Sequence, residues 1–206
     1  MNEVIQQLLN SEAKAIQNIP VEESFSRALE LIYKSVHTDH GKLIASGMGK
    51  AGQIAVNIAT TFSSTGTPAV FLHPSDAQHG DLGIIQRNDI LLLISNSGRT
   101  REIIELVQLT KNLYQHLPII LITGNPENEL SHIADAIIYT GNPDEVCPLG
   151  LTPTTSTTTM TVIGDVLVVM MMQKIGFNAE DYAKRHHGGY LGHKSRIVAG
   201  NHDINE

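Results

Sequence analysis

The sequence predicts an α/β protein, a three-layer αβα sandwich built on a five-stranded parallel sheet. Short, continuously apolar segments alternate with segments that carry apolar residues at helical spacing. Strands that are apolar on both faces are typical of a parallel sheet that helices cover on each side. Aromatic residues make up 4% of the chain and hydrophobic residues 41%, so aliphatic side chains must fill this core. The strands should be joined by right-handed crossovers.

The expected elements follow one another in a regular order. Two helices come first, at 4–19 and 21–36, and Pro20 separates them just before a pair of glutamates that suits a helix start. The five strands are short apolar runs, at 42–46, 69–72, 90–95, 119–122 and 136–139. The later helices are expected at 50–64, 102–114, 157–175 and, as a short one, 181–185.

Length, charge and cysteine content restrict the class of protein. The 206 residues correspond to one domain. Lys and Arg number 14 against 21 Asp and Glu, a net charge of −7, which argues against nucleic acid as a partner. One cysteine and an N-terminus without signal-peptide features indicate a cytoplasmic protein. The apolar stretch 162–172 is too short to span a bilayer and contains Asp165, so no membrane partner is expected.

The loop at 95–100 is the best candidate for binding phosphate. It leaves a strand and enters a helix, so free backbone N–H groups and the positive end of the helix dipole point outward. Ser95, Ser97 and Thr100 add hydroxyl groups, and Gly98 permits a close approach to the backbone. The alternative interpretation is an ordinary helix N-cap with a turn glycine.

Other strand ends also carry polar candidates. The segment 46–50 lacks the spacing of a dinucleotide or Walker motif, so Lys50 is either a charge for a sugar phosphate or a solvated lysine. His73 and His79 could bind a divalent metal, but two ligands do not make a structural site, and both can equally be polar loop residues. Cys147 is interpreted as a packed thiol.

Several segments at these strand ends form motifs in a fixed order. They are Gly47-Met48-Gly49-Lys50, His73-Pro74, His79-Gly80-Asp81-Leu82-Gly83, Ser95-Asn96-Ser97-Gly98 with Glu102, Cys147-Pro148-Leu149-Gly150-Leu151-Thr152-Pro153-Thr154, and His186-His187-Gly188-Gly189. Over roughly 42–194 the chain resembles the sugar isomerase (SIS) family of phosphosugar-binding domains, and within it the arabinose 5-phosphate isomerases. Two departures matter. His187 stands where the family usually has proline, and the chain ends shortly after Lys194, so we expect it to lack the C-terminal pair of nucleotide-sensing CBS modules.

The resemblance implies an SIS domain at 42–195, preceded by N-terminal helices at 1–41 that pack on it and followed by a polar tail at 196–206. It implies an isomerase that interconverts D-ribulose 5-phosphate and D-arabinose 5-phosphate through an enediol and supplies the sugar Kdo for lipopolysaccharide or capsule. No cofactor is expected. The partner is a small phosphosugar, and the family suggests a homotetramer with active sites at subunit interfaces.

By the same resemblance, four residues are catalytic. Glu102 would be the base that moves the carbon proton, and His186 the acid or base for ring opening or for the oxygens. Lys50 would neutralise oxyanion charge, and Glu145 would tune or orient the site. The residues expected to bind substrate are Ser46, Gly47, His73, His79, Ser95, Asn96, Ser97 and Thr100, and His73 could also accept an inhibitory zinc ion.

Two other functions remain open at this point. One is a different phosphosugar isomerase of the same fold, acting on a hexulose or heptose phosphate. The other is a non-catalytic sugar-phosphate sensor. A sensor needs the serine loop but not Glu102, Glu145 and His186 together, so their joint presence favours an enzyme.

Overall fold

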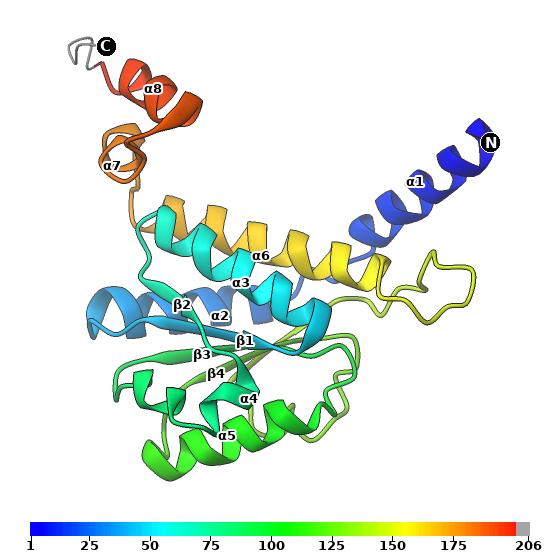
Figure 1. Ribbon diagram of the computed structural model, residues 1–206, viewed down its shortest axis with the longest axis horizontal. Coiled ribbons are helices and arrows are strands. Elements are labelled where there is room, and N and C mark those ends of the chain that lie inside the picture. Colours follow the sequence, from blue (N-terminus) through cyan, green and yellow to red (C-terminus); the bar gives the residue numbers. More distant parts are fainter. Residues whose placement is uncertain (201–206) are drawn as a thin grey trace.

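The centre of the fold is a five-stranded parallel sheet (Figure 1). The computed structural model describes residues 1–200 of the chain. The strands lie in the order β2-β1-β3-β4-β5, and each runs parallel to its neighbours. Their bounds are β1 (Leu43–Gly47), β2 (Ala69–Phe71), β3 (Ile90–Ile94), β4 (Ile119–Thr123) and β5 (Ala136–Tyr139). The predicted fold class is confirmed, and the strand order changes direction at β1 and β3, where such sheets bind ligands.

Helices cover both faces of the sheet because its central strands are apolar on both sides. One face packs against α2 (Glu23–Ile32), α3 (Gly49–Ser64) and α6 (Thr155–Lys174). The opposite face packs against α5 (Arg101–Leu113) and the short α4 (Pro74–Ala77). Three short features were not expected from the sequence: α4, the 3₁₀ turn η2 (Asp81–Ile84), and the π-helix η1 (Tyr33–Thr38) that continues α2.

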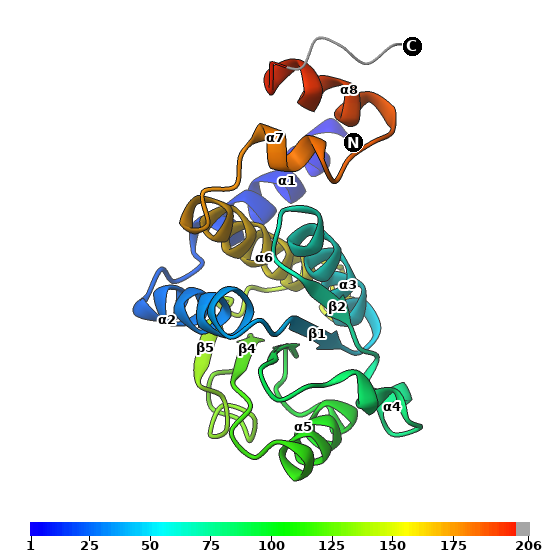
Figure 2. The same cartoon turned by 90° about the vertical axis from the view of Figure 1, so that its left-hand side faces the viewer.

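Two helical arms project from this body on the same side of the sheet (Figures 1 and 2). The first arm is α1 (Asn2–Gln17), which lies beside the start of α6 and leaves Val4, Ile5, Leu8 and Leu9 exposed. The second arm follows the end of α6 and consists of α7 (Ala179–Ala183) and α8 (Gly189–Val198).

Helix α8 was not expected, because two glycines at 188–189 favour a turn. The domain boundary expected after residue 195 falls inside this helix, which continues to Val198. Residues 201–206 of the expected polar tail lie outside the described part of the chain.

Within residues 1–200, α6 is the one helix that is long and apolar enough to cross a membrane, judged by length and composition. Half of its most apolar window is buried inside the protein. Ile163, Leu167 and Met171 of α6 belong to the main hydrophobic core. Helix α6 therefore packs as a core helix in this fold.

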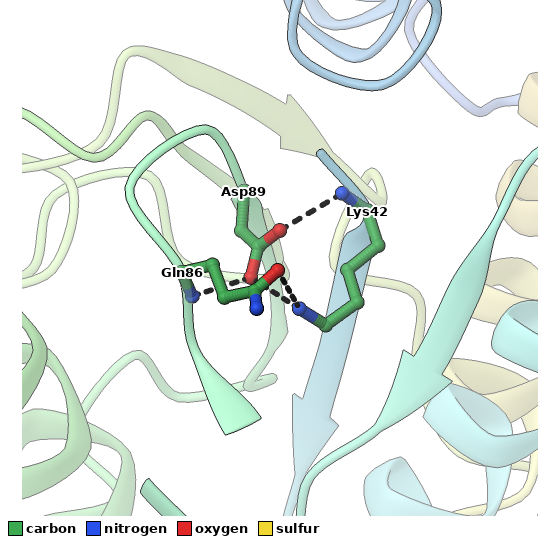
Figure 3. A network of polar contacts seen from close by, with 3 residues as sticks. All are labelled: Lys42, Gln86 and Asp89. Carbon is green, nitrogen blue, oxygen red and sulfur yellow. Dashed lines mark hydrogen bonds and ion pairs between the residues drawn. The ribbon is translucent and has the colours of Figure 1, made fainter. Parts of the chain in front are cut away.

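A buried ion pair fastens the amino ends of the two central strands (Figure 3). The Asp89 side chain is wholly buried and accepts hydrogen bonds from the Lys42 backbone N–H at 2.9 Å and the Gln86 backbone N–H at 2.7 Å. The Lys42 ammonium lies 2.7 Å from the same carboxylate. Since buried charges need partners, these contacts hold the loop before β3 against the start of β1.

Candidate functional site

A cavity of about 620 Å³ lies at the carboxyl ends of β1, β3, β4 and β5. Ligands of open parallel sheets bind at this edge, beside the change in strand order. The lining residues are Met48, Lys50, Ala51, Ile94, Ser95, Asn96, Ser97, Thr100, Gly124, Asn125, Pro126, Tyr139, Asn142, Pro153, Ser156, Thr157 and Met160. They come from the ends of separate strands and from the first turns of three helices.

The N-termini of α3, α5 and α6 meet at this cavity, because Lys50, Thr100 and Ser156 lie at their starts and line its wall. The first N–H groups of a helix have no partner within the helix, and the helix dipole makes this end positive. The cavity is therefore suited to an anion. Among the described residues that line it, Lys50 alone carries a charge, and that charge is positive.

The loop at 95–100 has the geometry expected of a phosphate-binding loop. The hydroxyls of Ser95 and Thr100 lie 2.9 Å apart, and the Ser97 hydroxyl accepts the Arg99 backbone N–H at 3.2 Å. No side chain caps α5 at Thr100, so its first N–H groups remain available. Gly98 has a φ of +66°, and a side chain there would collide with Asn128. Ser95, Asn96, Ser97 and Thr100 all line the cavity, as the sequence analysis predicted for substrate-binding residues.

Two other predicted substrate-binding residues are used inside the fold. The Ser46 hydroxyl is fully buried and donates a hydrogen bond to the Leu72 carbonyl at 2.7 Å. Gly47 packs against the start of α3, where an added Cβ would stand 2.8 Å from the Ala51 carbonyl. These two residues seat β1 against α3 and the segment after β2, next to the cavity.

Glu145 holds the N-terminus of α6. Its Oε2 accepts the Thr154 backbone N–H at 2.6 Å, the Thr154 hydroxyl at 2.8 Å and the Ser156 backbone N–H at 3.3 Å. Burial would raise the pKa of the Glu145 carboxyl, but these hydrogen bonds from Ser156 and Thr154 outweigh it and hold the pKa below its ordinary value. Glu145 is therefore a carboxylate tied to a helix whose next residues, Ser156 and Thr157, line the cavity.

The predicted base and the two loop histidines lie outside the cavity lining. Glu102 is partly exposed in the first turn of α5. His79 is exposed. His73 borders a separate hollow of about 440 Å³ with Asp76 and Asp81, and its Nδ1 lies 3.7 Å from the Asp76 carboxylate. In the described part of the chain no three His, Cys, Asp or Glu residues gather as a metal site, so His73 with Asp76 offers a zinc ion two ligands.

His186 belongs to the second arm. Its ring stacks on Tyr182 with the ring centroids 3.7 Å apart, and its Nδ1 lies 3.1 Å from the Tyr182 carbonyl oxygen. This arm follows the end of α6, whereas the cavity lies at the start of that helix (Figure 1). A helix of 20 residues is about 30 Å long. One chain therefore does not bring its own His186 to its own cavity.

Two lining asparagines were missed by the sequence analysis. Asn125 and Asn142 each follow a strand within the same sequence, Thr-Gly-Asn-Pro, which occurs at 123–126 and again at 140–143. Asn142 has a φ of +47°, a conformation that few residues other than glycine adopt. The repeated motif at two neighbouring strand ends was the signal that could have identified both.

Cys147 is less enclosed than expected. It is partly exposed in the loop after β5. Hydrogen bonds from the Thr152 hydroxyl and backbone N–H, and from the N–H groups of Leu149 and Leu151, lower the pKa of the Cys147 thiol to about 6. The thiol is thus a stabilised thiolate at neutral pH rather than an inert packed group.

The doubly wound sheet, with a cavity suited to an anion at its carboxyl edge, is the architecture of an α/β ligand-binding domain. Residues 38–170 match the SIS domain, and the chain belongs to this family. The family resemblance seen in the sequence is thereby confirmed.

Three relatives illustrate the similarity. Arabinose 5-phosphate isomerase KdsD of Yersinia pestis is 48% identical over 174 residues, which are 84% of this chain and 51% of that protein. The chain thus spans about half the length of the curated relatives it matches. A Bacteroides fragilis protein with a proposed role as a phosphosugar isomerase in capsule formation is 63% identical in sequence. Its crystal structure matches this fold with a TM-score of 0.91, covering 92% of this chain and 99% of that one. Protein c3406 of Escherichia coli CFT073, solved in complex with arabinose 5-phosphate, is 32% identical with a TM-score of 0.82, covering 89% of this chain and 96% of that one.

Proposed function

We propose that this chain is an aldose–ketose isomerase that interconverts D-ribulose 5-phosphate and D-arabinose 5-phosphate. The observation that carries the proposal is the meeting of three helix N-termini and the Lys50 ammonium at one cavity, an arrangement suited to a phosphate ester. The relatives support the choice of sugar, because one is named for this reaction and another is solved with arabinose 5-phosphate. A volume of about 620 Å³ is sufficient for a pentose phosphate.

The phosphate binds at the loop 95–100. Both α5 and α6 present N-termini to the cavity, but Glu145 already accepts N–H groups at the start of α6. A carboxylate there repels a second anion, whereas the start of α5 has no capping side chain. Ser97 and Thr100 then donate their hydroxyl protons to the phosphate oxygens, and Lys50 balances the charge. This anchoring fixes the position of the sugar carbons.

The reaction moves a proton between C1 and C2 through an enediol, and it requires no cofactor. Glu102 takes the carbon proton and returns it to the neighbouring carbon. His186 opens the sugar ring or moves the proton of an oxygen, and Lys50 stabilises the negative oxygen of the enediolate. Glu145, whose pKa is held low, stays ionised and orients the start of α6.

A neighbouring copy supplies His186 to each cavity, because the length of α6 separates the His186 of a chain from the cavity of the same chain. We therefore propose a homotetramer in which subunits complete each other's sites. Apolar side chains exposed on α1, α6 and α8 support such contacts; they include Leu8, Leu9, Val169, Met170 and Leu191. The remaining substrate contacts, from His73 and His79, lie on the edge of the sheet beside β2.

We place the reaction in the cytoplasm, in the supply of Kdo for lipopolysaccharide or capsule. The single cysteine supports a reducing compartment. The capsule-related role proposed for the Bacteroides relative supports the use of the product.

The test is the purified chain with ribulose 5-phosphate, observed by NMR for the aldose. We expect arabinose 5-phosphate to appear at enzymatic rates, and fructose 6-phosphate to serve as the hexulose control. Faster turnover of the hexulose phosphate would assign another isomerase of the same fold. Binding of the pentose phosphate without any turnover would assign a sensor instead.

A further inference from the structure

Helix α1 projects from the body, but its inner end contacts the start of α6. The Glu12 carboxylate accepts a hydrogen bond from the Thr155 hydroxyl at 2.9 Å, across 143 residues of sequence. Thr155 is the first residue of α6 and is 1% exposed. Its hydroxyl oxygen in turn accepts the backbone N–H of Val146 at 3.1 Å. One buried hydroxyl therefore joins α1 to the residue that follows Glu145.

The same short stretch of chain holds Glu145 itself. Its carboxylate is bound by Thr154 and Ser156, the residues on either side of Thr155. Beside them, Val4, Leu8 and Ser11 of α1 border a hollow of about 340 Å³ whose other wall includes Glu145 and Val146. Helix α1 thus lies directly against the segment that carries the carboxylate.

We propose that Glu12 is a positioning residue that fixes Glu145 through the Thr155 hydroxyl. The inference rests on the proposed function insofar as Glu145 serves the isomerase site. A hydroxyl that accepts a backbone N–H can still rotate its own proton, and an ionised carboxylate is the strongest acceptor to hold that proton in one direction. When Glu12 accepts the Thr155 hydroxyl proton, the hydrogen bond between Val146 and Thr155 keeps one geometry. The hydrogen bonds from Thr154 and Ser156 to Glu145 then keep their geometry as well.

The following variants distinguish a positioning role of Glu12 from a contact that only attaches α1 to the rest of the protein. Glu12→Ala removes the acceptor, whereas Glu12→Gln keeps an amide oxygen at the same place. Thr155→Val removes the hydroxyl with little change in shape. Glu3→Ala is the matched control, because Glu3 lies on the same helix and is exposed. Circular dichroism and sedimentation confirm that each variant keeps its fold and assembly.

We expect Glu12→Ala to lower kcat at least about tenfold while KM changes less than about threefold, since a small displacement of a catalytic group is costly. Glu12→Gln should recover most of this loss. Thr155→Val should lose at least as much as Glu12→Ala, because it also removes the acceptor of the Val146 N–H, and the double variant should be no worse than Thr155→Val alone. Glu3→Ala should behave as the parent protein.

A second readout does not need turnover. The pKa of the Glu145 carboxyl, followed by carbon NMR, should rise in Thr155→Val, which loosens its hydrogen bonds and keeps the Glu12 charge, and should stay unchanged in Glu3→Ala. Besides Glu145, the titratable groups of the two segments are Glu3, Glu12 and Lys14 on α1 and Asp144 and Cys147 beside Glu145, and assignment separates their signals. If the parent is inactive, the proposed function fails and this pKa still decides the inference. An unchanged Glu145 pKa, with melting temperature alone affected, would overturn it.

Discussion

Replacing Asp89 by Asn should strongly destabilise the protein without altering its substrate affinity. Asp89 is wholly buried and binds the backbone N–H groups of Lys42 and Gln86 as well as the Lys42 ammonium (Figure 3). An asparagine keeps the shape and one acceptor oxygen. At the place of Oδ2 its amide N–H₂ would face both the Gln86 N–H and the Lys42 ammonium, and at the place of Oδ1 it would face the Lys42 backbone N–H. In either case the Lys42 charge, with a side chain only 21% exposed, would lose its charged partner.

The size of the effect follows from this burial. Removing one partner of a buried ion pair costs about 3–5 kcal/mol, because the other charge stays in a poorly solvated place. For a chain of this length each kcal/mol shifts the melting temperature by about 2–4 °C, so Tm should fall by about 6–20 °C. Calorimetry at matched protein concentration measures the change. The network lies at the amino ends of β1 and β3, opposite the cavity, so KM of the folded protein should not move.

The control is Asp39→Asn, which breaks an exposed pair. Asp39 lies beside Lys34, whose side chain is 69% exposed. Exposed pairs contribute about 0–1 kcal/mol, so this variant should lose at most a few degrees. Equal, small losses from both variants would refute the argument that burial makes the Asp89 network the stronger one.

Four further predictions concern the site. Ser97→Ala should raise KM more than it lowers kcat, because a phosphate contact is shared by ground and transition states; steady-state kinetics decides. Glu102→Gln should abolish isomerisation while calorimetry still detects substrate binding, since an amide cannot accept the carbon proton. His186→Ala should cost at least about tenfold in kcat and His187→Ala far less, and equal small losses would return both to structural roles. Alkylation of Cys147 by iodoacetamide should reach half its maximal rate near pH 6, because its thiolate forms above the lowered pKa; a half-point near the ordinary value would contradict this.

The sheet could be predicted because its strands carry their own signal. Runs such as 90–95 are apolar at every position but the last, and β3 is buried throughout. The order of the strands could not be predicted, since pairing depends on contacts between distant segments. Helix α8 was missed for a local reason: it starts at a glycine that favours a turn, while packing against α7 holds the helix together.

Sequence could predict which residues line the cavity where position at a strand end decides it. The loop 95–100 leaves the end of a central strand, so its polar side chains can reach only the carboxyl edge of the sheet. Ser46 stands at a similar place, yet its hydroxyl turns inward to the Leu72 carbonyl. Sequence does not give side-chain direction at a strand end. It also does not show that the length of α6 separates His186 from the cavity of the same chain.

The carboxylate at α6 gives the proposed substrate a direction. Three helix N-termini face the cavity: Glu145 accepts two N–H groups at the start of α6, whereas no side chain caps α5 or α3. Of the latter two, the start of α5 also carries the Ser97 and Thr100 hydroxyls. We propose that the phosphate lies beside the Ser97 and Thr100 hydroxyls and that the sugar extends toward Ser156 and Thr157, which line the same cavity. That end of the cavity lies next to Glu145 and the α1 contact, whereas Glu102, the proposed base for the carbon proton, lies in the first turn of α5 beside the phosphate loop. Substitutions of the Ser97 and Thr100 hydroxyls should thus change KM, whereas Glu102→Gln in the turn that follows should change kcat.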